Sequence, residues 1–154
     1  MNVYEKLKQL NINIPAPPPK LGIYSSVTFF GDKLLYLSGC GPDVNSISPY
    51  LGKVGAELTI EEGCESSKLC AINMISKLDE ALGDLNKIKK FVKLTCFVAS
   101  DTEFFNQPKI ADGASSFLID VFGEEVALAS RSAVGVSVLP GNIPVEIEAL
   151  IELK

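Results

Sequence analysis

The sequence predicts an α+β domain in which two helices cover one face of a mixed β-sheet. Several short runs alternate apolar and polar residues, as half-buried strands do, and two longer segments repeat apolar residues at helical spacing. The resulting order, β-β-α-β-α-β-β, is typical of this fold class. With 154 residues and 47% hydrophobic content, the chain is long enough for one domain and short for two. We expect a single domain, 1–154, with an N-terminal segment at 1–21 and a core at 22–154.

The N-terminal segment is predicted to contain a short helix and an extended arm. Asn2 is a suitable N-cap for a helix that reaches Leu10, with Val3 and Leu7 on one side. The following PAPPP sequence at 15–19 enforces an extended backbone. We expect this arm to lie across the domain as a strap.

The core is predicted to begin with a β-hairpin and a long loop. Strand-like runs at 26–30 and 33–38 are joined by Gly31 and Asp32, a pair suited to a two-residue turn. Residues 39–55 are rich in Gly, Pro, Asn and Ser. A loop of this length often has a functional role.

Two helices and a buried strand are predicted next. Thr59 and Glu62 have the spacing of a capping box, so a helix should begin there and end at Gly83. Residues 93–99 (KLTCFVA) are β-branched and aromatic enough for a buried strand. Pro108 fits the first position of a second helix, and Gly123 its end.

The last two predicted strands carry the polar residues of greatest interest. In the first, Arg131 precedes an alternation of valines with small residues, and we expect Arg131 and the small residues to face away from the core (Ala133, Gly135, Ser137). In the second, branched apolar residues alternate with glutamates, which we also expect to face away from the core (Glu146, Glu148, Glu152).

Composition excludes several kinds of chemistry. The chain has no histidine, which removes the commonest general base and metal ligand, together with Ser/His and Cys/His nucleophile pairs. A net charge of −5 opposes binding to nucleic acid, and the one basic run, 87–93, is interpreted as a solvated edge. We expect no metal and no organic cofactor.

The sequence also predicts a cytoplasmic protein. No apolar run approaches the roughly 18 residues needed to span a bilayer, and the N-terminus resembles no secretory signal. The cysteines lack CxxC spacing, so we expect reduced thiols (Cys40, Cys64, Cys70, Cys96).

Four stretches carry a family resemblance. Residues 129–139 (ASRSAVGVSVL), followed after a spacer by 145–147 (VEI), resemble the C-terminal signature of the Rid family, the YjgF-like imine deaminases formerly labelled endoribonuclease L-PSP. The sequences at 22–25 (GIYS) and 35–39 (LYLSG) are similar to the opening hairpin of that family. The resemblance covers the core and fits a longer branch with an extra N-terminal segment. It implies the chorismate-mutase-like version of the α+β fold, assembled as a homotrimer.

The resemblance implies a site for a small 2-keto or 2-imino acid. Arg131, the only arginine, would bind the carboxylate with its planar fork, against the simpler interpretation of a surface salt bridge. Glu146 matches the water-activating glutamate of the family, against an ordinary outward-facing carboxylate. Tyr24 matches a pocket tyrosine, against a half-buried hairpin residue. The remaining expected contacts are backbone ones (Ser38, Gly39, Ala133).

Two residues depart from the family pattern. Ala133 stands where the family often has cysteine, so no thiol can act there, and Cys40 stands where glutamine is common. Three functions therefore remain open. The first is hydrolysis of 2-enamino and 2-imino acids to 2-keto acids and ammonia, the second is binding of a small carboxylate without turnover, and the weakest is cleavage of RNA.

Strand geometry predicts that neighbouring subunits share the site. A loop of about five residues between the last two strands favours an antiparallel relation, which places Arg131 and Glu146 at opposite ends of the sheet, roughly 20 Å or more apart. One small acid cannot reach both in one chain. If both act on it, they come from different subunits of a closed ring.

Overall fold

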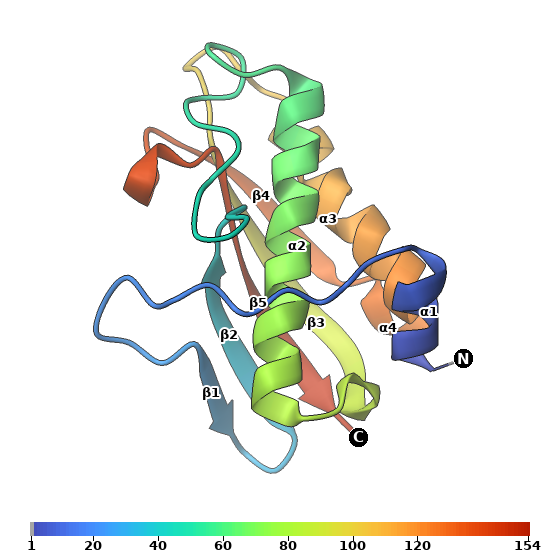
Figure 1. The fold of residues 1–154 in the computed structure, drawn as a ribbon. Helices are drawn as coiled ribbons and strands as arrows, with labels where there is room; N and C mark the ends of the chain where they lie inside the picture. The colour runs from blue at the N-terminus through green and yellow to red at the C-terminus, as the bar shows by residue number, and fades with distance from the viewer. Residues whose placement is uncertain (1) are drawn as a thin grey trace.

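The computed structural model describes residues 2–154 and has two long helices on one face of a five-stranded mixed sheet (Figure 1). This confirms the predicted α+β class and the order of the core elements. The elements are α1 (Val3–Gln9), β1 (Val27–Phe30), β2 (Leu34–Cys40), α2 (Ile60–Leu82), the short 3-10 helix η1 (Leu85–Lys87), β3 (Ile88–Ala99), α3 (Gln107–Phe122), α4 (Glu124–Ala127), β4 (Ser130–Val136), η2 (Pro140–Asn142) and β5 (Val145–Leu153).

The strand order in the sheet is β1-β2-β5-β3-β4. Strands β3 and β4 pair in parallel, whereas β5 pairs antiparallel with both β2 and β3. The last two strands of the chain are therefore antiparallel to one another, as predicted, with β3 between them. β1 and β4 form the two edges of the sheet.

The ends of the two long helices follow from local sequence. Thr59 caps α2 through the backbone N–H of Glu62, and the Glu62 side chain accepts a bond from the Thr59 backbone, which completes the predicted capping box. Gly83 ends α2 with a φ of 68°, a conformation that glycine adopts without strain. In α3, Pro108 lies in the first turn and Gly123 follows the last residue.

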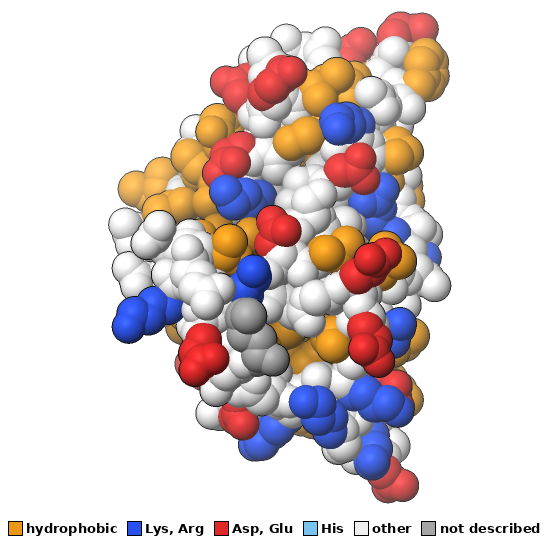
Figure 2. Space-filling model, turned by 90° about the vertical axis from the view of Figure 1, so that its right-hand side faces the viewer, with side chains coloured by type: hydrophobic (Ala, Val, Ile, Leu, Met, Phe, Trp, Pro, Cys, Tyr) orange, Lys and Arg blue, Asp and Glu red, His pale blue; other side chains and the backbone are white. Residues whose placement is uncertain are grey.

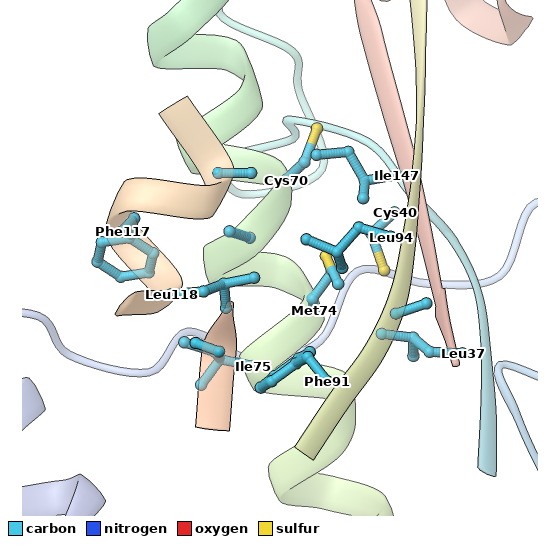
Figure 3. Close-up of a cluster of buried hydrophobic side chains, with 14 of the residues drawn as sticks. Leu37, Cys40, Cys70, Met74, Ile75, Phe91, Leu94, Phe117, Leu118 and Ile147 are labelled. Carbon is cyan, nitrogen blue, oxygen red and sulfur yellow. The ribbon is translucent and has the colours of Figure 1, made fainter. Parts of the chain in front are cut away.

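The core fills the space between the sheet and helices α2 and α3 (Figure 3). Met74 of α2, Leu118 of α3 and Leu94 of β3 are fully buried there. The two helices approach closely at Gly113, where an added Cβ would lie 2.9 Å from the backbone carbon of Cys64. This close contact with α3 fixes the position of α2 beside the sheet.

The N-terminal segment is part of the folded body. The Tyr4 hydroxyl of α1 donates to Asp79 of α2 at 2.6 Å, and Leu7 is buried. Beyond α1, the arm crosses α2, where the Ser76 hydroxyl donates to the Pro15 carbonyl at 2.7 Å (Figure 1). The predicted strap is therefore confirmed.

Two predicted boundaries were wrong. Phe30 pairs with Leu34, so the hairpin loop has three residues, 31–33, instead of two, and Gly31 supplies the positive φ of 58° that the turn requires. β3 begins at Ile88 and not at Lys93. Part of the basic run thus belongs to the strand, because Ile88 and Phe91 are buried between its lysines.

The predicted faces of β4 were reversed. Arg131 pairs with the buried Leu94, and both lie on the face that the helices cover. Val134 lies on the uncovered face with 41% of its surface exposed. The small residues are needed under α3: a Cβ on Gly135 would lie 2.8 Å from Nε2 of Gln107. Within residues 2–154, no helix is both long and apolar enough to cross a membrane.

Candidate functional site

A cavity of about 780 Å³ lies where β2 ends and the following loop begins. Four of the predicted site residues line it: Tyr24, Ser38, Gly39 and Glu146. The arm, the loop after β2, the η2 segment and helix α2 supply the other walls, through residues that include Pro18, Leu21, Ile47, Leu51, Ile143 and Lys77. The predicted rim loop and the predicted strap thus meet at one site.

Glu146 is the second residue of β5, and its side chain lines the cavity. Val145 and Ile147 are buried on the helical side, so Glu146 lies on the opposite face, where it is half-buried. Burial raises the pKa of Glu146, the nearby Lys77 ammonium lowers it, and Glu148 raises it. A carboxylate held in this way is a better proton acceptor than an exposed one.

Gly39 leaves room for the Glu146 carboxyl group. An added Cβ at Gly39 would overlap that group, lying 2.7 Å from its Cδ. The pairing of β2 with β5 shifts register between Leu37 and Cys40, which removes Ser38 and Gly39 from the regular ladder. This irregular stretch of backbone lines the cavity beside the Glu146 carboxyl group.

Tyr24 and Ser38 complete the predicted wall. Tyr24 belongs to the arm and has 41% of its surface exposed, so its ring is a lining residue and not a core residue. Ser38 is fixed by Ser26, the residue before β1, since its backbone N–H donates to the Ser26 carbonyl at 3.0 Å and its hydroxyl to the same carbonyl at 3.2 Å.

Two polar residues of α2 also line the cavity and were missed in the sequence. Asn73 and Lys77 are buried, with 3% and 6% of their surfaces exposed. Asn73 donates to the carbonyls of Gly41 and Asp43, both at 2.9 Å, and Lys77 Nζ donates to the Gly39 carbonyl at 3.3 Å. A signal was present: both residues interrupt the buried apolar stripe of α2, one helical turn apart.

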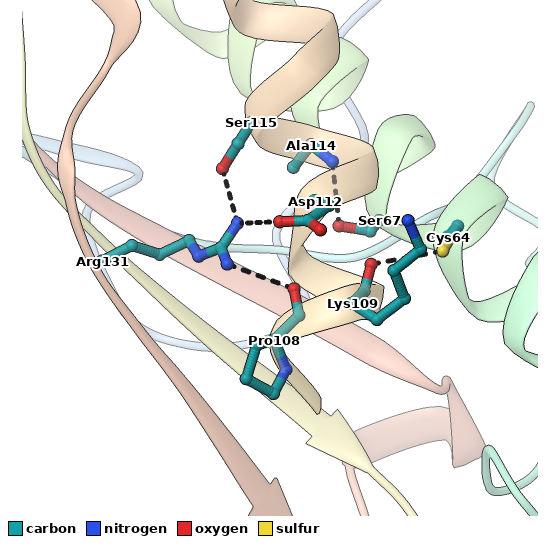
Figure 4. Close-up of polar contacts among 8 residues, drawn as sticks. All are labelled: Cys64, Ser67, Pro108, Lys109, Asp112, Ala114, Ser115 and Arg131. Carbon is teal, nitrogen blue, oxygen red and sulfur yellow. Dashed lines mark hydrogen bonds and ion pairs between the residues drawn. The ribbon is translucent and has the colours of Figure 1, made fainter. Parts of the chain in front are cut away.

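Arg131 lies outside this cavity. Its Nη1 donates to Asp112 and to Ser115, each at 3.0 Å, and its Nη2 donates to the Pro108 carbonyl at 3.1 Å (Figure 4). A guanidinium has five N–H donors. Among residues 2–154, the Nε–H and the second Nη2–H have no partner, so α3 holds the guanidinium and leaves two donors for another group.

Arg131 and Glu146 are well separated in one chain. Arg131 is level with Ala149 across β3, and Glu146 is level with Val134. An offset of three residues at about 3.3 Å each, and two strand spacings of about 4.8 Å, separate the backbones by about 14 Å. This is less than the predicted 20 Å, because β4 is short and lies alongside the start of β5. The two side chains also point to opposite faces of the sheet.

The two departures from the family pattern have clear structural positions. Ala133 lies on β4, paired with the buried Cys96 and packed against the edge of the core. Cys40 is buried at the cavity wall, and burial raises the pKa of its thiol to about 11. Cys40 is therefore a neutral packing residue. Within residues 2–154, no group of three or more His, Cys, Asp and Glu side chains is placed to hold a metal ion.

Comparisons with known proteins identify relatives of the whole chain. Residues 5–153 match the family model described as "YjgF/chorismate mutase-like, putative endoribonuclease". Protein TCP17 of Trypanosoma cruzi is 40% identical over 152 residues, which cover 99% of this chain and 94% of TCP17.

Solved structures give the same result. Atu1372 of Agrobacterium tumefaciens, of unknown function, superposes with a TM-score of 0.90 at 35% identity, covering 99% of this chain and 92% of its own. A Shewanella oneidensis protein with the same endoribonuclease description has a TM-score of 0.94 at 29% identity, covering 99% and 100%. YyfA of Yersinia pestis, a Rid protein of unknown function, covers 89% and 93%, with 25% identity and a TM-score of 0.60. The first two also share the N-terminal segment, which places this chain with the longer relatives.

Proposed function

Because the chain belongs to the YjgF/chorismate mutase-like family, we propose that it hydrolyses small 2-imino and 2-enamino acids to 2-keto acids and ammonia, at sites that neighbouring subunits build together. The observation that carries this proposal is the position of Glu146. It is a half-buried carboxylate with a raised pKa, in a cavity that also contains the irregular backbone at Ser38 and Gly39.

The proposed reaction needs only a base and an anchor for the acid. Glu146 takes a proton from water, the hydroxide adds to the carbon of the C=N bond, and this proton passes to the nitrogen to give a carbinolamine. The hydroxyl proton of the carbinolamine then moves to the nitrogen through Glu146, so that the C–N bond breaks, ammonia leaves and a C=O bond forms. Arg131 of a neighbouring subunit binds the carboxylate through its two unoccupied donors. The contact with α3 would hold that guanidinium in one orientation before the ligand arrives.

The uncovered face of the sheet supports a closed assembly. Phe30, Tyr36 and Val134 lie on this face with 43%, 42% and 41% of their surfaces exposed. A sheet face with several exposed apolar side chains is stabilised when other copies cover it, and a homotrimer would bury three such faces together. The same assembly would bring Arg131, at the β4 edge, toward the cavity of another subunit.

RNA cleavage has less support. Over most of the face in Figure 2, acidic side chains lie among the basic ones, and basic side chains gather only at its lower end. The net charge of the chain is −5. Binding to a phosphate backbone depends on clustered positive charge.

One experiment tests the proposal directly. An amino-acid oxidase generates the imino acid in solution, and ammonia release is followed with and without the protein. We expect faster release with the wild-type protein and no acceleration with Glu146→Gln. Equal rates with and without the wild-type protein would rule out deamination. Calorimetry with 2-oxobutyrate would then show whether the cavity binds an acid without turnover.

A further inference from the structure

Helix α2 presents three buried polar side chains toward the arm and the cavity. Asn73, Ser76 and Lys77 have 3%, 2% and 6% of their surfaces exposed. Two of them have an evident structural task. Asn73 holds the loop after β2 through the carbonyls of Gly41 and Asp43, and Ser76 holds the arm through the carbonyl of Pro15. Each donor hydrogen of these two side chains thus has a partner.

Lys77 has no comparable set of partners. Its ammonium has three donor hydrogens, and its partners within residues 2–154 are the Gly39 carbonyl, at 3.3 Å, and the Cys40 thiol. No carboxylate of the described residues lies within the 4.0 Å of an ion pair, although Glu146 lines the same cavity. The neighbouring Cys40 thiol is neutral, because burial raises its pKa to about 11. The charge of Lys77 therefore has no anion in direct contact.

A buried charge without a direct counterion is destabilising, and an anion in the cavity would remove this cost. A neutral carbonyl oxygen could accept a hydrogen bond but would not neutralise the ammonium, and Glu146 interacts with Lys77 only from beyond ion-pair distance. The cavity has room for such a ligand: its volume of about 780 Å³ is within the range of sites that bind molecules much larger than a three-carbon acid.

We propose that Lys77 binds a second carboxylate of the ligand, so that the site prefers 2-imino and 2-keto acids whose side chain ends in a carboxylate. This inference rests on the proposed function. Lys77 lies on the inner wall formed by α2, with 6% of its surface exposed. Arg131 belongs to a neighbouring subunit in the proposed assembly and must enter from the open side. The two cations thus meet the ligand at different ends, and a dicarboxylic acid has an anionic group for each.

The test compares two ligands of one shape. 2-Oxoglutarate and 2-oxoglutaramate differ only in whether the side chain ends in a carboxylate or an amide. By calorimetry we expect wild-type protein to bind 2-oxoglutarate at least about tenfold more tightly, the scale of one charge-assisted hydrogen bond. Lys77→Met should abolish this preference while changing the affinity for the amide by less than about twofold. Lys77→Arg should retain part of it.

Lys68→Met is the matched control, because Lys68 lies on the same helix with its side chain 40% exposed and outside the cavity. The Lys68→Met protein should still bind 2-oxoglutarate more tightly than 2-oxoglutaramate. Equal binding of both ligands by wild-type protein refutes the role of Lys77 without any variant, so a folding defect in Lys77→Met cannot rescue the idea. A loss of affinity for both ligands in a folded Lys77→Met protein also contradicts it, since Lys77 would then contact a group that both share.

Failure of the proposed function would look different. A wild-type preference for 2-oxoglutarate without ammonia release from any imino acid would leave the Lys77 assignment standing and remove the deaminase assignment. Ammonia release that depends on Glu146 but is equally fast for imino acids with acidic and with neutral side chains would support the deaminase assignment and remove the Lys77 assignment. A wild-type protein that binds neither ligand would contradict both.

Discussion

Arg131 and Glu146 should restore activity to one another across subunits. The backbones of these residues are separated by about 14 Å along and across the sheet, and their side chains lie on opposite faces. A single chain cannot place both on one small acid. If each site takes Arg131 from one subunit and Glu146 from its neighbour, Arg131→Ala and Glu146→Ala proteins are each inactive, but mixed rings contain intact sites.

The expected recovery follows from counting. In rings assembled at random from equal amounts of the two variants, a site is intact when its Arg131 comes from one variant and its Glu146 from the other. Each condition holds for half the subunits, so about a quarter of the sites should be intact. Ammonia release should therefore rise from near zero to about a quarter of the wild-type value.

The assay uses proteins refolded together from denaturant, with each variant refolded alone as the baseline. A second mixture, wild type with the Arg131→Ala/Glu146→Ala double variant, reports subunit mixing. It should give about a quarter of wild-type activity if rings mix and sites are shared, and about a half otherwise. Full mixing by mass spectrometry with no recovery in the first mixture would refute the shared site, as would a monomer at micromolar concentration.

Four other predictions concern single residues. Arg131→Lys should weaken binding of 2-oxobutyrate by about 1 to 3 kcal/mol, because the fork geometry is lost, and equal affinities by calorimetry would contradict the carboxylate assignment. Glu146→Gln should bind the same ligand with nearly wild-type affinity but release little ammonia, since an amide is no base; undiminished release would remove Glu146 from the mechanism. Gly39→Ala should lower kcat, because the new Cβ overlaps the Glu146 carboxyl group. Gly22→Ala should leave kcat unchanged, because its new Cβ would meet only the Tyr24 ring, at 3.6 Å. Equal kcat values for the two variants would show that the position of the Glu146 carboxyl group is unimportant. Finally, kcat/KM should rise with pH as Glu146 loses its proton, with a midpoint above the usual glutamate value of about 4.3. Lys77→Met should move that midpoint upward, because the Lys77 ammonium lowers the pKa of Glu146. A pH profile unchanged by the substitution would contradict this coupling.

The local features of the fold were predictable because they depend on short-range chemistry. The Thr59 capping box, the glycine that ends α2 and the proline that starts α3 are all read from a few neighbouring residues. The same holds for Glu146, which alternates with buried residues whatever lies across the sheet. These features needed no knowledge of the neighbouring elements.

The features that depend on packing were harder to predict. The period of two shows that Arg131 and Val134 lie on different faces, but the choice of the core face was wrong. Valine ordinarily belongs in the core, and only the close approach of α3 explains why small residues lie there instead. Lys77 was missed for a similar reason, because a lysine within a helix is usually solvated, and its burial depends on an arm and a loop distant in sequence.

The contacts of helix α1 have a consequence for synthesis of the chain. The Val3 N–H bonds to Asn86, and the Tyr4 hydroxyl accepts from the Leu85 N–H, so the partners are separated by 83 and 81 positions. Chains emerge from the ribosome with the N-terminus first. The first helix therefore leaves the ribosome long before its docking surface exists, and a helix of 7 residues is marginal by itself. Residues 3–9 should therefore be among the last of this domain to find their native contacts, although they are made before the residues that they contact.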